Sequence, residues 1–404
     1  MKVSKSDRYV PTSVWTSVIS VLAGLGMAGM AVADSAMSLD PIEPSNGLKF
    51  GDLTVSPYLD VLYIYDSNYR RVKNGDKAES ANLKPGFDFN YENEGPHKFS
   101  GNFWYLFEEY LDQKKIDSNQ WREELRYLYR SPREVTFRID QSMGTTTKNN
   151  KNAILDTINE DRTEYAIQTA LRVPISHKNA IEVMAGVENT DYKSETSSDR
   201  RAYPFDLDLA HRISEKTDVL LGTGYTLEKS KGPAGTVDSK AYRVKTGLAS
   251  VMTEKLSYRA SIGAEGYEYG NAGSLKWGPY YNLDLTWLAS RKWTWMLAGT
   301  GKHQSASDEG SYGLSYNGSL RAAYQMNRRM NWATSLNWQF NEYNNKNIAS
   351  NRDDEDVGVR VDYTYRLTKY ASLRLGAEAS QKMSTVAASE YDRYRVDAGV
   401  NFRY

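Results

Sequence analysis

The chain has 404 residues with 51 basic and 51 acidic side chains and no Cys, which excludes disulfides and Cys-ligated zinc or iron–sulfur sites. A mean hydropathy of −0.65 and 30 Tyr exclude a protein built of several apolar membrane helices. The balanced charge gives no reason to expect a nucleic-acid partner.

The N-terminus has the pattern of a secretory signal peptide. Basic residues precede an uncharged, mostly apolar stretch that ends in Ala31-Val32-Ala33. This order predicts cleavage before Asp34. An uncleaved N-terminal anchor is the alternative, and this Gly- and Ala-rich segment is barely long enough to form one. The predicted organisation is a signal peptide over residues 1–33, a short periplasmic segment over 34–50 and a barrel domain over 51–404.

Much of the remaining chain alternates between apolar or aromatic residues and polar ones, the period of a strand whose faces differ. The clearest runs are residues 82–92, 121–130 and 356–366. In the last run, Val359 and Val361 alternate with Arg360 and Asp362. Such runs exceed the ~5–6 residues of an ordinary strand and suit the ~9–11 residues of a tilted membrane strand. Because lipid leaves no backbone group unpaired, such strands cross only as a closed barrel.

Connections between these runs alternate between short and long. Short charged segments lie at residues 93–98, 131–133, 174–179, 213–217, 252–255, 290–292, 327–329 and 367–369, and longer hydrophilic ones at 67–79, 143–162, 229–239 and 341–354. Bacterial outer-membrane barrels combine tight periplasmic turns with longer outer loops in this way. With a first strand near 53–65 and a last at 394–404, we predict an all-β, antiparallel transmembrane barrel of about 18 strands. A β-propeller would need four short strands in each repeat of about 40 residues.

The final strand alternates up to the terminal aromatic residue Tyr404. This ending resembles the C-terminal β-signal of outer-membrane barrels. With the strand pattern and the turn asymmetry, the chain resembles bacterial outer-membrane porin-like proteins, most closely the putative β-barrel porin family, which is often linked to surface polysaccharides. The resemblance implies the Gram-negative outer membrane, contact with its lipid and insertion by the barrel-assembly machinery. Aromatic residues near the short turns suit a membrane belt: Trp293, Trp295, Trp332, Tyr258, Tyr370 and Tyr404.

Polar positions of the alternating runs should face the lumen. The candidate pore-lining residues are Arg122, Arg126, Arg130, Arg138, Asp140, Arg360, Asp362, Arg366, Arg374 and Arg395. An 18-stranded barrel is too wide for side chains to fill, so we predict passive diffusion of small hydrophilic or charged solutes, with sugars or oligosaccharides among them. Arg forks could guide anionic sugars. Alternatively, these charges neutralise one another, as the sequences Arg122–Glu124–Arg126 and Arg360–Asp362 suggest.

The connection over residues 143–162 is the third outer loop, and the third loop forms the constriction in general porins. The resemblance is one of position and length. Candidate constriction residues are Lys148, Lys151, Asp156, Glu160 and Asp161. The alternative is a mobile surface loop.

Other classes of function have weaker support. A barrel enzyme of protease or lipase type would need catalytic groups, and among four His only His303 with Asp308 forms a pair worth considering. We expect no catalytic site, metal or cofactor. The segment Asp34–Gly51 is too short for the plug of an energy-coupled receptor. A surface adhesin, or a structural barrel linked to polysaccharide export, remains an alternative.

Overall fold

A computed structural model describes residues 47–404, with gaps at residues 72, 93–94, 112–117, 147–160, 194–198, 233–234, 254, 271–274, 306–310 and 346–351. The expected signal peptide and most of the segment 34–50 lie outside the described residues. Within the described ranges, no helix is long and apolar enough to cross a membrane.

The described chain is almost entirely strand. A short β1 (Leu48–Phe50) precedes a run of long strands, and one 3-10 turn, η3 (Ala387–Ser389), lies before the last of them. The long strands are β2 (Leu53–Asp66), β3 (Ala78–Glu92), β4 (His97–Tyr110), β5 (Ser118–Arg130), β6 (Thr136–Thr146), β7 (Arg162–Pro174), β8 (Asn179–Tyr192), β9 (Asp199–Ser214), β10 (Thr217–Gly232), β11 (Gly235–Thr253), β12 (Leu256–Tyr269), β13 (Lys276–Trp287), β14 (Trp293–Ser305), β15 (Ser311–Gln325), β16 (Met330–Asn345), β17 (Arg352–Arg366), β18 (Ala371–Ser384) and β19 (Tyr391–Arg403).

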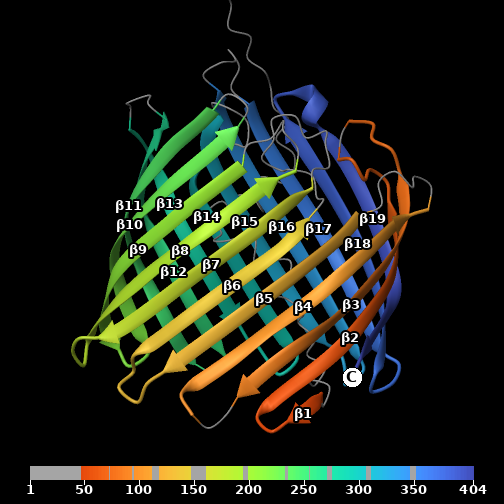
Figure 1. Ribbon diagram of the computed structural model, residues 1–404, viewed down its shortest axis with the longest axis horizontal. Coiled ribbons are helices and arrows are strands. Elements are labelled where there is room, and N and C mark those ends of the chain that lie inside the picture. Colours follow the sequence, from red (N-terminus) through yellow and green to blue (C-terminus); the bar gives the residue numbers. More distant parts are fainter. Residues whose placement is uncertain are drawn as a thin grey trace, which may run out of the picture.

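These eighteen strands close into one antiparallel barrel. Each long strand pairs with the next along the chain, and β19 returns to pair with β2, where Arg403 lies opposite Tyr58 and Arg395 opposite Asp66. Figure 1 shows the strands tilted across the wall, with the chain ending at the rim that carries the tight turns. The expected strand number and the eight short connections are confirmed.

One expected long loop is wrong. Residues 229–239 belong to a tall hairpin, because β10 and β11 remain paired up to Gly232 opposite Gly235. Only residues 233–234 separate the two strands. A strand that projects beyond the membrane has water on both faces, so it loses the alternation that marks a buried strand and its sequence looks like a loop. The short β1, which pairs with the start of β2, was likewise not expected.

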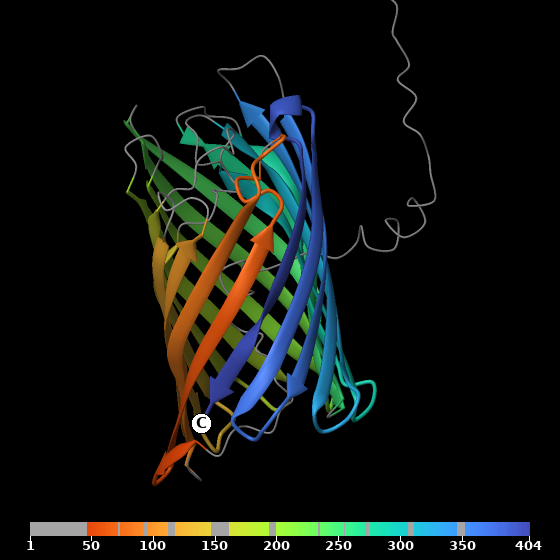
Figure 2. The ribbon, with the colours of Figure 1, turned by 90° about the vertical axis from the view of Figure 1, so that its right-hand side faces the viewer.

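The barrel is flattened, since it is broader in Figure 1 than in Figure 2. Strands β9–β11 form one narrow edge in Figure 1, and β18, β19 and β2 lie at the other. We call these edges the β10 corner and the β18 corner. Between them lie two broad walls.

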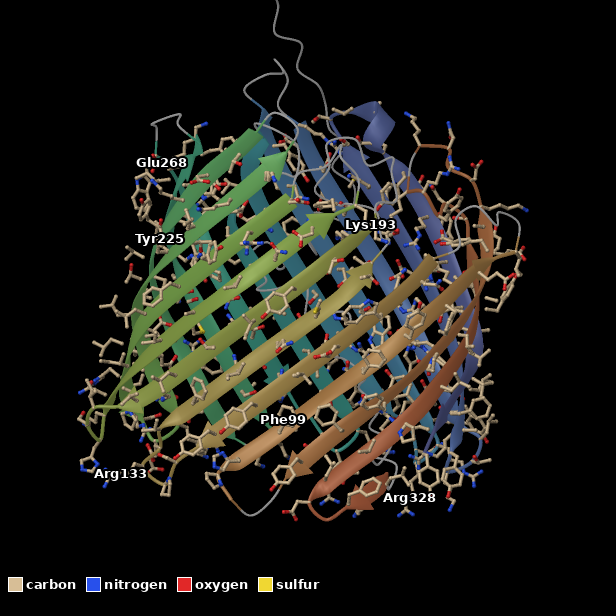
Figure 3. The ribbon with its side chains drawn as sticks, in the orientation of Figure 1. Phe99, Arg133, Lys193, Tyr225, Glu268 and Arg328 are labelled. Carbon is tan, nitrogen blue, oxygen red and sulfur yellow. The ribbon has the colours of Figure 1, made fainter. Side chains whose placement is uncertain are left out.

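The outer surface is apolar between two charged rims. Val359 is 42% exposed, and outward Trp293, Trp332, Tyr370 and Tyr404 are exposed near the tight-turn rim, as expected for a membrane belt. In this belt, Trp293 stacks on Tyr324 with ring centres 4.5 Å apart. Figure 3 shows Arg133 and Arg328 at the tight-turn rim and Lys193 and Glu268 at the opposite one. This pattern fits an apolar band flanked by water.

Candidate functional site: the charged lumen

In every strand, alternate side chains face the lumen. All ten pore-lining candidates have this lumen-facing parity. On β17, for example, Arg360 and Asp362 contact charged residues of neighbouring strands inside the barrel, whereas Val359 between them faces outward. The lumen is therefore strongly polar, and its charges decide what it can do.

The β10 corner holds a compact group of ion pairs. Lys245 Nζ lies 2.8 Å from Asp206 Oδ1 and 3.1 Å from Asp208 Oδ1, although β11 and β9 are separated by β10. Arg243 Nη1 lies 3.1 Å from the same Asp206 oxygen. On the lumen face of β10 stands Gly222, where a Cβ would collide with the Asp208 carboxylate. The missing side chain lets the ion pairs cross over β10.

The network extends along the wall on both sides of this corner. Arg259 Nη2 on β12 lies 2.7 Å from Glu182 Oε2 on β8 and 3.0 Å from Asp208 Oδ2. Arg172 Nη2 on β7 lies 2.6 Å from Asp218 Oδ2 on β10. Side chains from β8 and β12, four strands apart, touch only because the wall bends sharply here. Removing a cation from such a pair would strand a largely buried carboxylate, which is strongly destabilising. The pairs add little to the ion selectivity of the lumen, because their charges cancel locally.

At the β18 corner an ion pair also crosses a strand at a Gly. Arg360 Nη2 on β17 lies 2.6 Å from Asp362 Oδ1 and 2.9 Å from Asp397 Oδ1 on β19. Between them, β18 presents Gly376, whose Cβ would meet Asp397 Oδ2 at 2.5 Å. The predicted Arg360–Asp362 ion pair on β17 is confirmed. The second ion pair, from Arg360 across β18 to Asp397 of β19, was not predicted.

The broad wall at β5 and β6 is only partly neutralised. The expected Arg122–Glu124 pair is present at 2.8 Å. The expected link from Glu124 to Arg126 is wrong, because Arg126 pairs with Asp140 of β6 at 2.7 Å. Arg138 shares the same carboxylate at 2.6 Å. Two Arg thus share one acid, and the Arg126 side chain is 60% exposed to the lumen.

The broad wall at β14–β16 is nearly uncharged. Its lumen-facing side chains are mostly hydroxyls and amides: Thr300, Ser315, Asn317, Ser319, Ser335, Asn337, Gln339 and Asn341. Lys302 of β14 and Arg321 of β15 are the charged exceptions. Hydroxyl and amide groups can donate and accept hydrogen bonds, which suits polyhydroxylated solutes.

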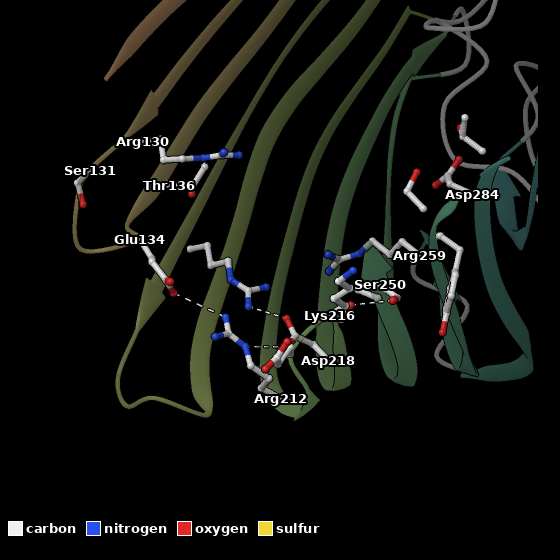
Figure 4. Close-up of a pocket in the computed structure, with 16 residues that line it drawn as sticks. Arg130, Ser131, Glu134, Thr136, Arg212, Lys216, Asp218, Ser250, Arg259 and Asp284 are labelled. Atoms are coloured by element: carbon white, nitrogen blue, oxygen red, sulfur yellow. Dashed lines mark hydrogen bonds and ion pairs between the residues drawn. The ribbon is translucent and has the colours of Figure 1, made fainter. Parts of the chain in front are cut away.

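A cavity of about 760 Å³ opens at the tight-turn end of the lumen, and its lining residues come from strands between β5 and β13. Figure 4 shows Arg212 between two acids, Glu134 of the β5–β6 turn and Asp218. Arg212 lies 3.6 Å from the former and 3.7 Å from the latter. This mouth is polar and wide, as an aqueous channel requires.

The catalytic pair considered from the sequence is His303 with Asp308. Asp308 lies outside the described residues, so only His303 can be placed. His303 fills a break in the wall, because β13 and β14 pair only from Tyr281 opposite Gly301 toward the tight-turn end. Beyond the break, the backbone N–H of His303 donates to Glu265 Oε1 at 2.7 Å. The imidazole stacks on Tyr267 with ring centres 5.3 Å apart. These contacts give His303 a structural role at the break.

Most of the candidate constriction residues also lie outside the described residues. Lys148, Lys151, Asp156 and Glu160 lie in the undescribed segment 147–160. Asp161 is described and pairs with Lys193 at 3.0 Å, at the rim next to β7 and β8. Narrowing of the pore by this loop stays a prediction. In the described part of the chain, no group of three or more acidic, His or Cys residues could hold a metal ion.

Four charged lumen residues were not among the sequence candidates. Arg243, Lys245 and Glu265 form the centre of the β10 corner. Arg393 of β19 donates from Nε to Asp66 Oδ2 of β2 at 2.9 Å, where these two strands close the barrel. All four have lumen-facing parity in their strands. Their charge and parity were readable from the sequence. Their partners were not, because ion pairs across an intervening Gly strand depend on how sharply the wall bends.

A closed 18-stranded barrel with an apolar outer belt and a charged, polar lumen defines this chain as a porin-like protein of the outer membrane. Residues 232–404 match the model of the family described as "Putative beta-barrel porin 2", which confirms the resemblance seen in the sequence. The comparison with curated proteins found no match.

Several solved barrels are similar in fold. OccAB2 of Acinetobacter baumannii is 8% identical with a TM-score of 0.44, covering 90% of this chain and 99% of its own. OpdQ of Pseudomonas aeruginosa is 12% identical with a TM-score of 0.42, covering 88% and 99%. The FrpB iron transporter of Neisseria meningitidis (F3-3 variant) is 10% identical with a TM-score of 0.43, covering 86% of this chain. The chain spans 63% of FrpB's length. At these scores, the likenesses carry no argument about solutes.

Proposed function

We propose that this protein is a channel for passive diffusion of small hydrophilic solutes across the outer membrane. The observation that carries the proposal is the segregation of lumen charge. Buried ion pairs collect at the two narrow corners, and the broad walls between them keep exposed polar groups, so the interior can hold water.

The hydroxyl and amide wall of β14–β16 supports sugars or short oligosaccharides as solutes. Such groups hydrogen-bond to sugar hydroxyls without demanding charge. The described residues favour no catalytic reading, because the one catalytic candidate, His303, holds the wall together.

Liposome swelling tests this proposal. Vesicles containing the refolded protein should swell in isotonic glucose faster than protein-free vesicles, with the rate falling as the sugar lengthens, because a water-filled lumen sieves by size. The control is the same protein denatured before reconstitution. Absence of swelling from a correctly folded barrel with every sugar tested would contradict an open diffusion channel.

A further inference from the structure

Three neighbouring connections at the tight-turn rim share one sequence pattern. They are residues 288–292 between β13 and β14, 326–329 between β15 and β16, and 367–370 between β17 and β18. Each begins with an exposed apolar residue, continues with Ser, Asn or Thr and then carries Arg or Lys. Together they hold five cations and no acidic residue: Arg291, Lys292, Arg328, Arg329 and Lys369. We call these five residues the basic strip.

The polar residue of each turn holds the backbone in the same way. The side-chain oxygens of Ser290, Asn327 and Thr368 each accept hydrogen bonds from the backbone N–H groups two and three positions later, at 2.8–3.1 Å. Such bonds stabilise tight turns. The cations are therefore presented by three turns of the same form. Figure 3 shows one of them, Arg328, at the rim.

The three turns are contiguous along the rim. The backbone N–H of Gln325 donates to Lys292 O at 2.8 Å, and that of Arg366 donates to Arg329 O at 2.8 Å. The Lys292 ammonium also donates to Met326 O at 3.3 Å. Since each hairpin adds two strands, successive turns lie about 10 Å apart. The basic strip therefore runs without interruption from β13 to β18.

The charge of the strip is not neutralised by its surroundings. All five residues are exposed, and none forms an ion pair with a carboxylate of the described chain. The C-terminal carboxylate lies near one end, where Tyr404 stacks on Tyr370 with ring centres 5.4 Å apart. Five cations against this one anion leave the strip net positive. The other half of the rim is mixed, with Glu134 in the β5–β6 turn and Glu215 in the β9–β10 turn.

Exposed aromatic side chains adjoin the strip on the outer face of the barrel. Trp293, Trp332 and Tyr370 belong to the membrane belt, and Lys369 Nζ lies 4.5 Å from the centre of the Tyr370 ring. Amphipathic rings favour the level of the lipid headgroups. The strip therefore lies where headgroup phosphates are found.

We propose that the basic strip binds the phosphodiester headgroups of anionic phospholipids in the periplasmic leaflet of the outer membrane. Each Lys or Arg close to an anionic lipid surface strengthens binding about fivefold. The adjoining rings favour a lipid over a soluble polyanion, because a lipid meets the cations with its headgroup and the rings with its acyl chains. This binding surface is independent of what crosses the lumen.

Native mass spectrometry of the detergent-purified protein tests the strip, with phosphatidylglycerol and zwitterionic phosphatidylethanolamine titrated separately. The wild type should bind phosphatidylglycerol at least about fivefold more tightly than phosphatidylethanolamine. In the triple variant Arg291→Gln, Arg328→Gln and Lys369→Gln, the dissociation constant for phosphatidylglycerol should rise at least about tenfold. Binding of phosphatidylethanolamine should change less than about twofold, because its headgroup has no net charge.

The matched control removes three exposed cations from the mixed half of the rim, through Arg133→Gln, Lys178→Gln and Lys216→Gln. This variant should change phosphatidylglycerol affinity less than about twofold, because the altered residues lie outside the strip. Equal losses in the two triple variants, or equal binding of both lipids by the wild type, would overturn the proposal. Displacement of phosphatidylglycerol by equimolar polyglutamate would overturn the lipid assignment and favour an acidic periplasmic partner. If the first triple variant does not refold, Arg328→Gln with Arg329→Gln, confined to one turn, should weaken phosphatidylglycerol binding in the same direction.

Discussion

Replacing Val359 by Arg should destabilise the barrel by about 2–4 kcal/mol, the cost of a cation on the lipid face near the bilayer midplane. Val359 lies at the middle of β17, faces outward and is 42% exposed to the surroundings of the barrel. An Arg there would place its guanidinium in hydrocarbon. Reversible guanidinium unfolding in lipid vesicles gives the free energy of unfolding.

The adjacent Gly358 provides the matched control at the same depth. It has lumen-facing parity, and a Cβ added there would meet Ser380 Cβ at 3.5 Å, an ordinary contact. Gly358→Arg should therefore change the free energy of unfolding by less than about 1 kcal/mol, because its charge enters water. Equal losses for both variants would mean that we have assigned the two faces of β17 wrongly.

Replacing Gly222 by Val should cost about 3 kcal/mol of stability, because the new side chain displaces the buried Asp208 carboxylate from its cations. Asp208 is 2% exposed and is held by Lys245 and Arg259. The same replacement at Gly358, where space is open, should cost less than about 1 kcal/mol. Denaturant midpoints of both variants give the comparison.

A double-mutant cycle separates a collision with the ion pairs from a general effect of Val in β10. In an Asp208→Ala background, Gly222→Val should cost at least about 1 kcal/mol less than in the wild type, because the group it strikes is gone. The same cost in both backgrounds would show that Gly222 is not needed for the ion pairs of the β10 corner.

The sequence predicted the barrel well because the determining signals are local. Alternation fixes which face of a strand meets lipid, so the run around Val359 and Arg360 could be assigned without a structure. Turn-prone segments fix the strand ends, and their number gives the strand count. The same reasoning failed at residues 229–239, where the hairpin projects into water and alternation no longer marks a strand.

The lumen was predictable in composition but not in arrangement. Parity identified Arg360 and Asp362 as inward, and their pairing followed from adjacency on one strand. The bond from Arg360 to Asp397 crosses a strand at Gly376 and depends on the flattened cross-section, which no local pattern encodes.

Single-channel conductance of the refolded wild-type protein tests the central claim most directly, namely that the charges of the two corners are paired and the space between the broad walls is open to water. We expect discrete current steps whose size rises in proportion to KCl concentration, as for an aqueous pore rather than a saturating site. A protein that is folded and inserted, as shown by heat-modifiable migration and strand-type circular dichroism, but gives no conductance steps would contradict the account.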